Sequence, residues 1–186
     1  MIGLTGDTGM GKTTALKAFG LKQNVFYYYI DRTVNPRVFL ERLLVDMGIS
    51  FCGRLNDLQY KVVEELNTLQ EPLLIIDESG KLGNKMIMLL HSLRDLTKDN
   101  CGIVLAGMPD FKNALIKNVN AGVTGYAEFF RRINIWHSLN GLSYDEIKMV
   151  LESNGITDKE AQRDYKRLNR FGDLMNEIML QKLVNN

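Results

Sequence analysis

Short apolar stretches alternate along the chain with segments long enough to form helices. Four stretches are apolar almost throughout, as strands buried on both faces of a sheet are: residues 1–5, 25–30, 73–76 and 102–106. A fifth strand is expected within residues 133–139, where apolar and polar positions alternate. Helices are expected in between, over residues 12–21, 36–47, 55–69 and 82–98. The pattern predicts an α/β fold with a parallel five-stranded sheet flanked by helices.

After residue 142 the pattern favours helices only. Ser143 and Glu146 have the spacing of a capping box that opens one helix. Thr157 is expected to cap a second helix, and Gly172 is expected to precede a third. We therefore expect two parts, an α/β domain over residues 1–140 and a small helical lid over residues 141–186.

Composition narrows the class of protein but not its partners. The 186 residues are 45% hydrophobic and 24% charged, as in a globular domain, and the net charge of +1 gives no bulk attraction to nucleic acid. Cys52 and Cys101 lack the spacing of a metal site or a disulfide framework. No apolar run approaches the roughly 20 residues that cross a bilayer, and Met1 leads directly into a strand instead of a signal peptide. A cytoplasmic protein without a membrane partner is expected.

A phosphate-binding motif lies between the first predicted strand and the first predicted helix. It matches G-x-x-x-x-G-K-[ST] at every position: Gly6, Asp7, Thr8, Gly9, Met10, Gly11, Lys12 and Thr13. Glycines let backbone amides turn toward phosphates, Lys12 reaches the β and γ oxygens, and Thr13 ligates Mg²⁺. Thr14 is a candidate for the α-phosphate. The motif predicts that the chain binds ATP with Mg²⁺.

Two carboxylates end the third predicted strand. Asp77 and Glu78 follow the apolar residues 73–76, at the carboxyl end of a strand, where ligands bind in open α/β sheets. Asp77 is expected to hold the metal directly or through water, and Glu78 to orient or deprotonate the attacking water. A nucleotide kinase is disfavoured, because transfer to an acceptor needs no water-activating glutamate. The pair predicts ATP hydrolysis.

The order of the motifs resembles that of AAA+ ATPases. The phosphate loop and the acidic pair are followed by Ile103-Val-Leu-Ala-Gly-Met-Pro109, Phe129-Phe-Arg-Arg-Ile133 and Leu142-Ser-Tyr-Asp-Glu-Ile147. Within AAA+ ATPases this order is similar to that of the phage Mu B-type transposition proteins and related transposon target-selection ATPases. The resemblance covers almost the whole chain.

That resemblance implies an ATP-dependent homo-oligomer on double-stranded DNA that delivers a target to a transposase without sequence preference. A neighbouring subunit would supply an arginine to the γ-phosphate, with Arg132 as the first candidate and Arg131 as the second. DNA contacts are implied at basic residues after the second and third strands: Arg32, Arg37, Lys81 and Lys85.

The sequence departs from that pattern at three places. The strand over residues 102–107 ends without the Asn, Ser or Thr that many AAA+ proteins use to position water, and Asn100 lies at its other end. Met175 stands at the position of the lid arginine, for which Arg170 is a possible substitute, so hydrolysis is expected to be slow. Relatives carry an N-terminal segment before the first strand, so a trimmed chain is expected.

Two alternatives stay open: a nucleotide-gated assembly protein with little hydrolysis, and an AAA+ motor or loader for replication or secretion.

Two residue patterns allow both a structural and a functional interpretation. Four basic residues fall on one face if residues 163–170 form a helix, and a solvated face is favoured over phosphate contact: Arg163, Lys166, Arg167 and Arg170. Three consecutive tyrosines, Tyr27 to Tyr29, lie in the second strand, where alternating burial explains them better than base stacking. His91 and His137 are expected to pack or to lie at the surface, not to bind a ligand.

Overall fold

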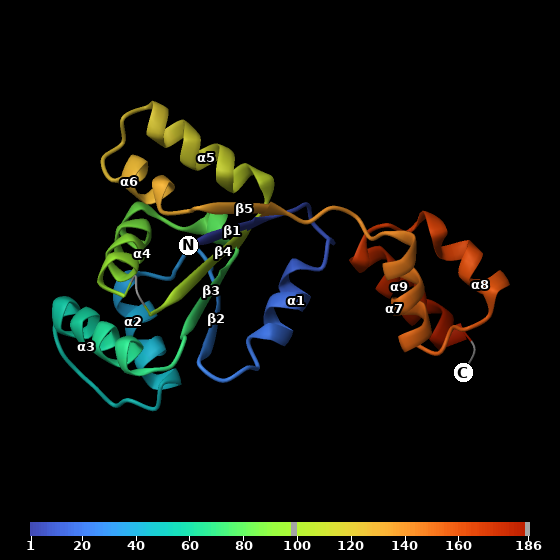
Figure 1. Ribbon diagram of the computed structural model, residues 1–186, viewed down its shortest axis with the longest axis horizontal. Helices are drawn as coiled ribbons and strands as arrows, with labels where there is room; N and C mark the ends of the chain where they lie inside the picture. The colour runs from blue at the N-terminus through green and yellow to red at the C-terminus, as the bar shows by residue number, and fades with distance from the viewer. Residues whose placement is uncertain (98–99, 185–186) are drawn as a thin grey trace. The chain divides into compact units, whose positions relative to one another are not determined.

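The computed structural model describes residues 1–97 and 100–184 (Figure 1). Five parallel strands form one sheet in the order β2-β3-β4-β1-β5. The strands are β1 (Ile2–Thr5), β2 (Val25–Tyr29), β3 (Leu73–Asp77), β4 (Gly102–Gly107) and β5 (Ile135–Ser138). The predicted α/β fold with five parallel strands is therefore confirmed.

The helix over Pro36–Asp46, α2, begins at the residues that local capping signals indicate. Asn35 accepts hydrogen bonds from the backbone N–H of Arg37 and Val38 at 3.0 and 3.1 Å, and Pro36 occupies the first position of α2. The helices of the predicted set are α1 (Lys12–Phe19), α2 (Pro36–Asp46), α3 (Leu55–Thr68) and α4 (Asn84–Leu96). The predicted end of the fourth helix, Lys98, lies outside the described residues.

Two helices that the sequence analysis did not predict lie between β4 and β5. They are α5 (Pro109–Asn120) and α6 (Tyr126–Arg131). Pro109 at the first position of α5, with Phe111 and Leu115 four residues apart and both buried, is the local signal that was available. Gly125 precedes α6 with a φ of 82°, a conformation that favours glycine.

The two faces of the sheet are covered unequally. Helices α2 to α6 cover one face and form the large core, in which Phe39, Leu90 and Phe129 are fully buried (Figure 1). On the other face α1 packs through Leu16 against Ile75 and Ala106 in a much smaller cluster. Within the described residues of the sheet domain, α1, which begins at Lys12, is thus the helix that covers the second face.

The chain divides into two compact units. One contains residues 1–5 and 13–138, and the other contains Gly6–Lys12 together with residues 139–186. The second unit has its own core of five buried residues, namely Ile147, Leu151, Tyr165, Leu174 and Ile178. Residues Gly6–Lys12 of the phosphate loop are therefore grouped by their contacts with the helical unit.

The helical unit contains α7 (Tyr144–Ser153), α8 (Lys159–Asp164), the 3₁₀ turn η2 (Tyr165–Arg167) and α9 (Phe171–Val184) (Figure 1). The capping box of Ser143 and Glu146 is confirmed, because each side chain bonds the backbone N–H of the other. The expectation for Thr157 is wrong, because α8 begins two residues later at Lys159. The expectation for Gly172 is also wrong, because it lies in the first turn of α9.

In the part of the chain that the structure describes, no helix combines the length and the apolar character that a bilayer crossing needs.

Candidate functional site

The predicted phosphate loop follows β1 and continues into α1. Gly9 and Gly11 have φ values of +80° and +84°, which residues with a Cβ atom adopt only at a cost. The backbone N–H of Met10 points back to the carbonyl of Asp7 at 3.4 Å. The two motif glycines are thus required by the turn itself, before any ligand is considered.

Lys12 braces this loop. Its side chain is buried, and its Nζ donates to the carbonyl of Gly6 at 2.6 Å and to the carbonyl of Asp7 at 2.9 Å. An ammonium group has three N–H donors, so one donor and the full positive charge remain for an anion. A buried cation surrounded by backbone groups is suited to binding phosphate oxygens.

The start of α9 lies against the same loop, within the helical unit. The backbone N–H of Gly172 donates to the carbonyl of Gly9 at 2.8 Å. A Cβ atom on residue 172 would lie 3.3 Å from the Cα of Gly9, which explains the glycine there. A Cβ atom on residue 11 would lie 3.2 Å from the Phe171 ring. Arg170 runs beside Gly9, with its Cβ and Cδ 4.0 Å from where a Cβ on Gly9 would be. Arg170, named from sequence as a substitute for the missing lid arginine, is therefore next to the loop.

Within the sheet unit, Asp77 and Thr13 meet although they are 64 residues apart. The Oγ1 of Thr13 donates to Oδ2 of Asp77 at 2.8 Å. Asp77 is 1% exposed, and its Oδ1 accepts the backbone N–H of Glu78 at 2.8 Å. A hydroxyl oxygen beside a carboxylate is the kind of oxygen donor set that Mg²⁺ takes in nucleotide sites, where phosphates and waters complete the coordination. Thr13 and Asp77 thus fit the metal that the motif implies.

Among the described residues there is no cluster of three or more His, Cys, Asp or Glu side chains that could hold a metal without phosphates.

Glu78 differs from its neighbour in conformation and surroundings. Its φ of 57° and ψ of 37° are left-handed, which is uncommon for a residue other than glycine and is typical of functional sites. Its half-buried carboxylate lies 3.3 Å from Nζ of Lys81, and that same Nζ donates to the hydroxyl of Tyr29 at 3.0 Å. The Glu78 carboxylate, which was predicted to activate the attacking water, therefore forms an ion pair with Lys81.

Tyr27 is a site residue that the sequence analysis treated as a packing residue. Its hydroxyl donates to Oδ2 of Asp77 at 2.9 Å. Burial, reinforced by this hydrogen bond, raises the pKa of the Tyr27 phenol above its ordinary value, so the group remains a neutral donor. The predicted alternation explains which face of the sheet each tyrosine occupies. It carries no information about a hydrogen bond to a residue 50 positions away in the sequence.

The two candidate trans arginines have different surroundings. Arg132 is held by Asp95 in a two-bond pair, with Nε to Oδ1 at 2.6 Å and Nη2 to Oδ2 at 2.7 Å. This pair holds the pKa of Asp95 below its usual range. Arg131 is exposed, and no hydrogen bond or ion pair engages its side chain within residues 1–97 and 100–184. Arg131 is the more available of the two.

The four basic DNA candidates also differ in availability. Arg37 pairs with Glu41 at 2.8 Å and donates to the carbonyl of Gly53 at 3.1 Å, and Lys81 is tied to Glu78. Arg32 and Lys85 are exposed and, among the described residues, have no ion pair.

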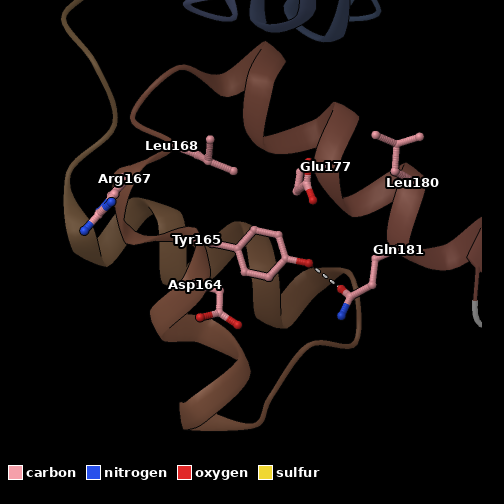
Figure 2. Close-up of a pocket in the computed structure, with 7 residues that line it drawn as sticks. All are labelled: Asp164, Tyr165, Arg167, Leu168, Glu177, Leu180 and Gln181. Carbon is pink, nitrogen blue, oxygen red and sulfur yellow. Dashed lines mark hydrogen bonds between the residues drawn. The ribbon is translucent and has the colours of Figure 1, made fainter.

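The basic stripe expected over residues 163–170 does not lie on one helix. Arg163 is in α8, Lys166 and Arg167 are in η2, and Arg170 follows the end of that turn. The helix stops because Tyr165 turns into the core, where its hydroxyl bonds Gln181. A hollow of about 590 Å³ opens beside Tyr165, between η2 and α9 (Figure 2). Two acids, Asp164 and Glu177, line it against one cation, Arg167, so its net charge does not favour phosphate.

Comparison with known proteins agrees with the motifs. The AAA domain family matches residues 1–115. No curated protein sequence matches the chain.

Several solved structures are similar in fold. The ORC2 protein of Aeropyrum pernix, solved in ADPNP and ADP complexes, is 17% identical with a TM-score of 0.62, over 94% of this chain and 53% of that one. The ORC1 protein of Aeropyrum pernix in complex with DNA is 14% identical with a TM-score of 0.58, over 99% of this chain and 54% of that one. A Walker-type ATPase of Pyrococcus abyssi is 14% identical with a TM-score of 0.51, over 98% and 68%.

At these identities the likeness concerns the fold alone, and the chain spans about half the length of the two ORC proteins. The family match covers more than half of the 186 residues and includes both the phosphate loop and the acidic pair. The chain belongs to the AAA domain family.

Proposed function

We propose that this protein binds ATP with Mg²⁺ and hydrolyses it as a homo-oligomer on double-stranded DNA, where it selects a target for a transposase. The observation that carries the nucleotide part is the 2.8 Å hydrogen bond between Thr13 and Asp77. It joins the last residue of the phosphate motif to the acid that ends β3, as the chemistry of a Mg²⁺-dependent ATPase requires.

The residues divide the work of hydrolysis. The backbone of residues 6–11, with Lys12, binds the β and γ phosphates, and Thr14 is assigned to the α-phosphate. Thr13 and Asp77 would hold Mg²⁺, which would neutralise charge that develops on the phosphate oxygens. Glu78 accepts the proton of the attacking water, and for this its carboxylate must exchange Lys81 for that water.

Oligomerisation on DNA is supported by the available cations. Arg131 is assigned to the γ-phosphate of a neighbouring subunit in place of Arg132, because Asp95 already holds Arg132. Arg32 and Lys85 are assigned to DNA phosphates, with Arg37 and Lys81 as secondary contacts, and all four follow the carboxyl ends of β2 and β3. Such contacts carry no base specificity, as a target selector requires. The transposase as partner rests on the resemblance in motif order alone.

A second candidate is a nucleotide-gated assembly protein with little hydrolysis. It is favoured by the end of β4, where Ala106 and Gly107 offer no polar side chain for the attacking water, and by Met175 in the lid. An AAA+ motor or loader for replication or secretion is a third alternative, and it differs from the first candidate in having no transposase partner.

The test is phosphate release by the wild type and by Glu78→Gln, with and without duplex DNA, combined with light scattering. We expect DNA to stimulate the wild type. Glu78→Gln should lose hydrolysis by about a hundredfold or more while keeping ATP affinity, because it removes a group used mainly in the transition state. It should then accumulate as ATP-bound oligomers on DNA.

Glu71→Gln is the matched control, because Glu71 is an exposed glutamate with a positive φ just before the other end of β3. Arg131→Ala should reduce hydrolysis only under conditions that form oligomers, whereas Arg132→Ala should leave it near the wild-type rate. Parental hydrolysis by Glu78→Gln would remove Glu78 from the mechanism. Slow turnover of the wild type with no response to DNA would favour the assembly protein.

A further inference from the structure

The three consecutive tyrosines of β2 each place the hydroxyl against a different charged group. Tyr27 donates to Asp77, Tyr28 donates to Asp46, and Tyr29 accepts from Lys81. Side chains alternate along a strand, so Tyr27 and Tyr29 share one face while Tyr28 lies on the other. The cores agree, since Tyr28 packs in the large cluster and Tyr27 packs in the small cluster under α1.

The acceptor positions of Asp77 are nearly all used. A carboxylate offers about four such positions, two on each oxygen. Oδ2 receives both Thr13 and Tyr27, at 2.8 and 2.9 Å, and Oδ1 receives the backbone N–H of Glu78. With three donors on two oxygens the plane of the carboxylate is fixed, and one acceptor position on Oδ1 is left for Mg²⁺ or for water bound to it.

We propose that Tyr27 is a positioning residue for the metal site: its hydroxyl fixes the orientation of Asp77 toward Mg²⁺. This inference rests on the proposed function. The strand register explains how the contact arises, because Tyr27 pairs with Ile75 in the parallel β2–β3 ladder and Asp77 lies two residues further on, on the same face of the neighbouring strand. The Tyr27 hydroxyl then approaches Oδ2 from the β2 side.

A phenol suits this position better than a cation. Lysine or arginine would orient the carboxylate equally well, but its charge would neutralise Asp77 and compete with Mg²⁺. A neutral donor fixes the side chain and leaves its negative charge for the metal. Partners of this kind, which bond a metal ligand but not the metal, typically change metal affinity by about tenfold to a hundredfold when removed.

The hydroxyl can be tested apart from the ring. Tyr27→Phe keeps the ring that packs in the α1 cluster and removes only the donor to Asp77. Tyr28→Phe is the matched control, because it removes one hydroxyl from one aspartate on the opposite face of the same strand. The readout is binding of a fluorescent ATP analogue during a Mg²⁺ titration, which requires no turnover.

For Tyr27→Phe we expect the half-saturating Mg²⁺ concentration to rise about tenfold, with binding of the nucleotide in EDTA unchanged. Tyr28→Phe should leave the Mg²⁺ requirement at the wild-type value, whatever its effect on thermal unfolding. In an Asp77→Asn background, Tyr27→Phe should add nothing further, because Tyr27 acts through that carboxylate.

Three results would overturn the inference: an unchanged Mg²⁺ requirement in Tyr27→Phe, an equal rise in Tyr28→Phe, or additive effects of Tyr27→Phe and Asp77→Asn. A wild type that binds the analogue equally well with and without Mg²⁺ would instead contradict the metal role of Thr13 and Asp77 in the proposed function. The two failures are thus separable in one titration.

Discussion

The phosphate loop and the acid end of β3 are stabilised by different kinds of contact. The phosphate loop, in the helical unit, is held through its backbone carbonyls, of which two accept from Nζ of Lys12 and a third accepts from the backbone N–H of Gly172. The acid end of β3, in the sheet unit, is stabilised by side chains, since Asp77 receives hydroxyls from Thr13 and Tyr27.

This difference explains why one part follows from a motif and the other does not. A loop that works through backbone N–H groups requires glycines and one lysine at fixed spacing, and the spacing is visible in the sequence. A carboxylate that works through side-chain partners needs any donor that the fold brings near it. The loop should therefore be sensitive to substitutions that crowd its backbone. The acid end of β3 should be sensitive to substitutions that remove a single side-chain oxygen atom.

The largest effect is expected from Lys12→Ala. This variant removes the buried cation and both bonds to the loop carbonyls, so nucleotide affinity should fall by at least about a hundredfold, with or without Mg²⁺. Lys17→Ala, at an exposed position near the end of α1, is the control. Calorimetric titration with ATP gives the comparison, and near-normal affinity of Lys12→Ala would contradict the phosphate-loop assignment.

A smaller and more selective loss is expected from Asp77→Asn. The amide N–H₂ cannot accept hydrogen bonds, so at least one of the contacts from Thr13, Tyr27 and Glu78 is lost together with the charge that attracts Mg²⁺. Affinity in the presence of Mg²⁺ should fall about tenfold to a hundredfold, while affinity in EDTA stays close to that of the wild type. If the loss were the same in EDTA, the two parts of the site would not be separable as described.

The smallest effect is expected from Gly172→Ala, which affects the loop only by steric crowding. The added methyl group would lie 3.3 Å from Cα and 3.4 Å from the carbonyl oxygen of Gly9, so α9 or the loop must shift, at a cost of about 1 kcal/mol in the free energy of unfolding. Gly83→Ala is the control, because nothing lies within 4 Å of its added methyl group. Thermal unfolding with and without ATP measures both variants. Equal melting temperatures for the two would show that the contact of Gly172 with the loop does not matter for stability.

Four of the five strands were predictable because they read as nearly continuous apolar runs, and β5 was predictable from its alternation of apolar and polar positions. Helix α8 was harder, because the sequence allows a helix through residue 170 and only the burial of Tyr165 against the lid core ends it. In the site, the sequence indicated Lys12, Thr13, Asp77 and Glu78 by motif. The sequence could not rank Arg131 above Arg132, because the partner that occupies Arg132 is Asp95 on α4, 37 residues away. It could not assign Tyr27 for the same physical reason, since strand register decides which hydroxyl meets Asp77.

The hydrogen bond from Gly172 to Gly9 has a mechanical consequence. A peptide group is planar and rigid, so the carbonyl of Gly9 and the N–H of Met10 cannot turn independently. A phosphate that draws the Met10 N–H toward itself must rotate the whole plane, and the carbonyl on its other side then pulls on the first turn of α9. Phosphate bound in the loop would thus act on the first turn of α9 through a single peptide plane, without any side chain taking part.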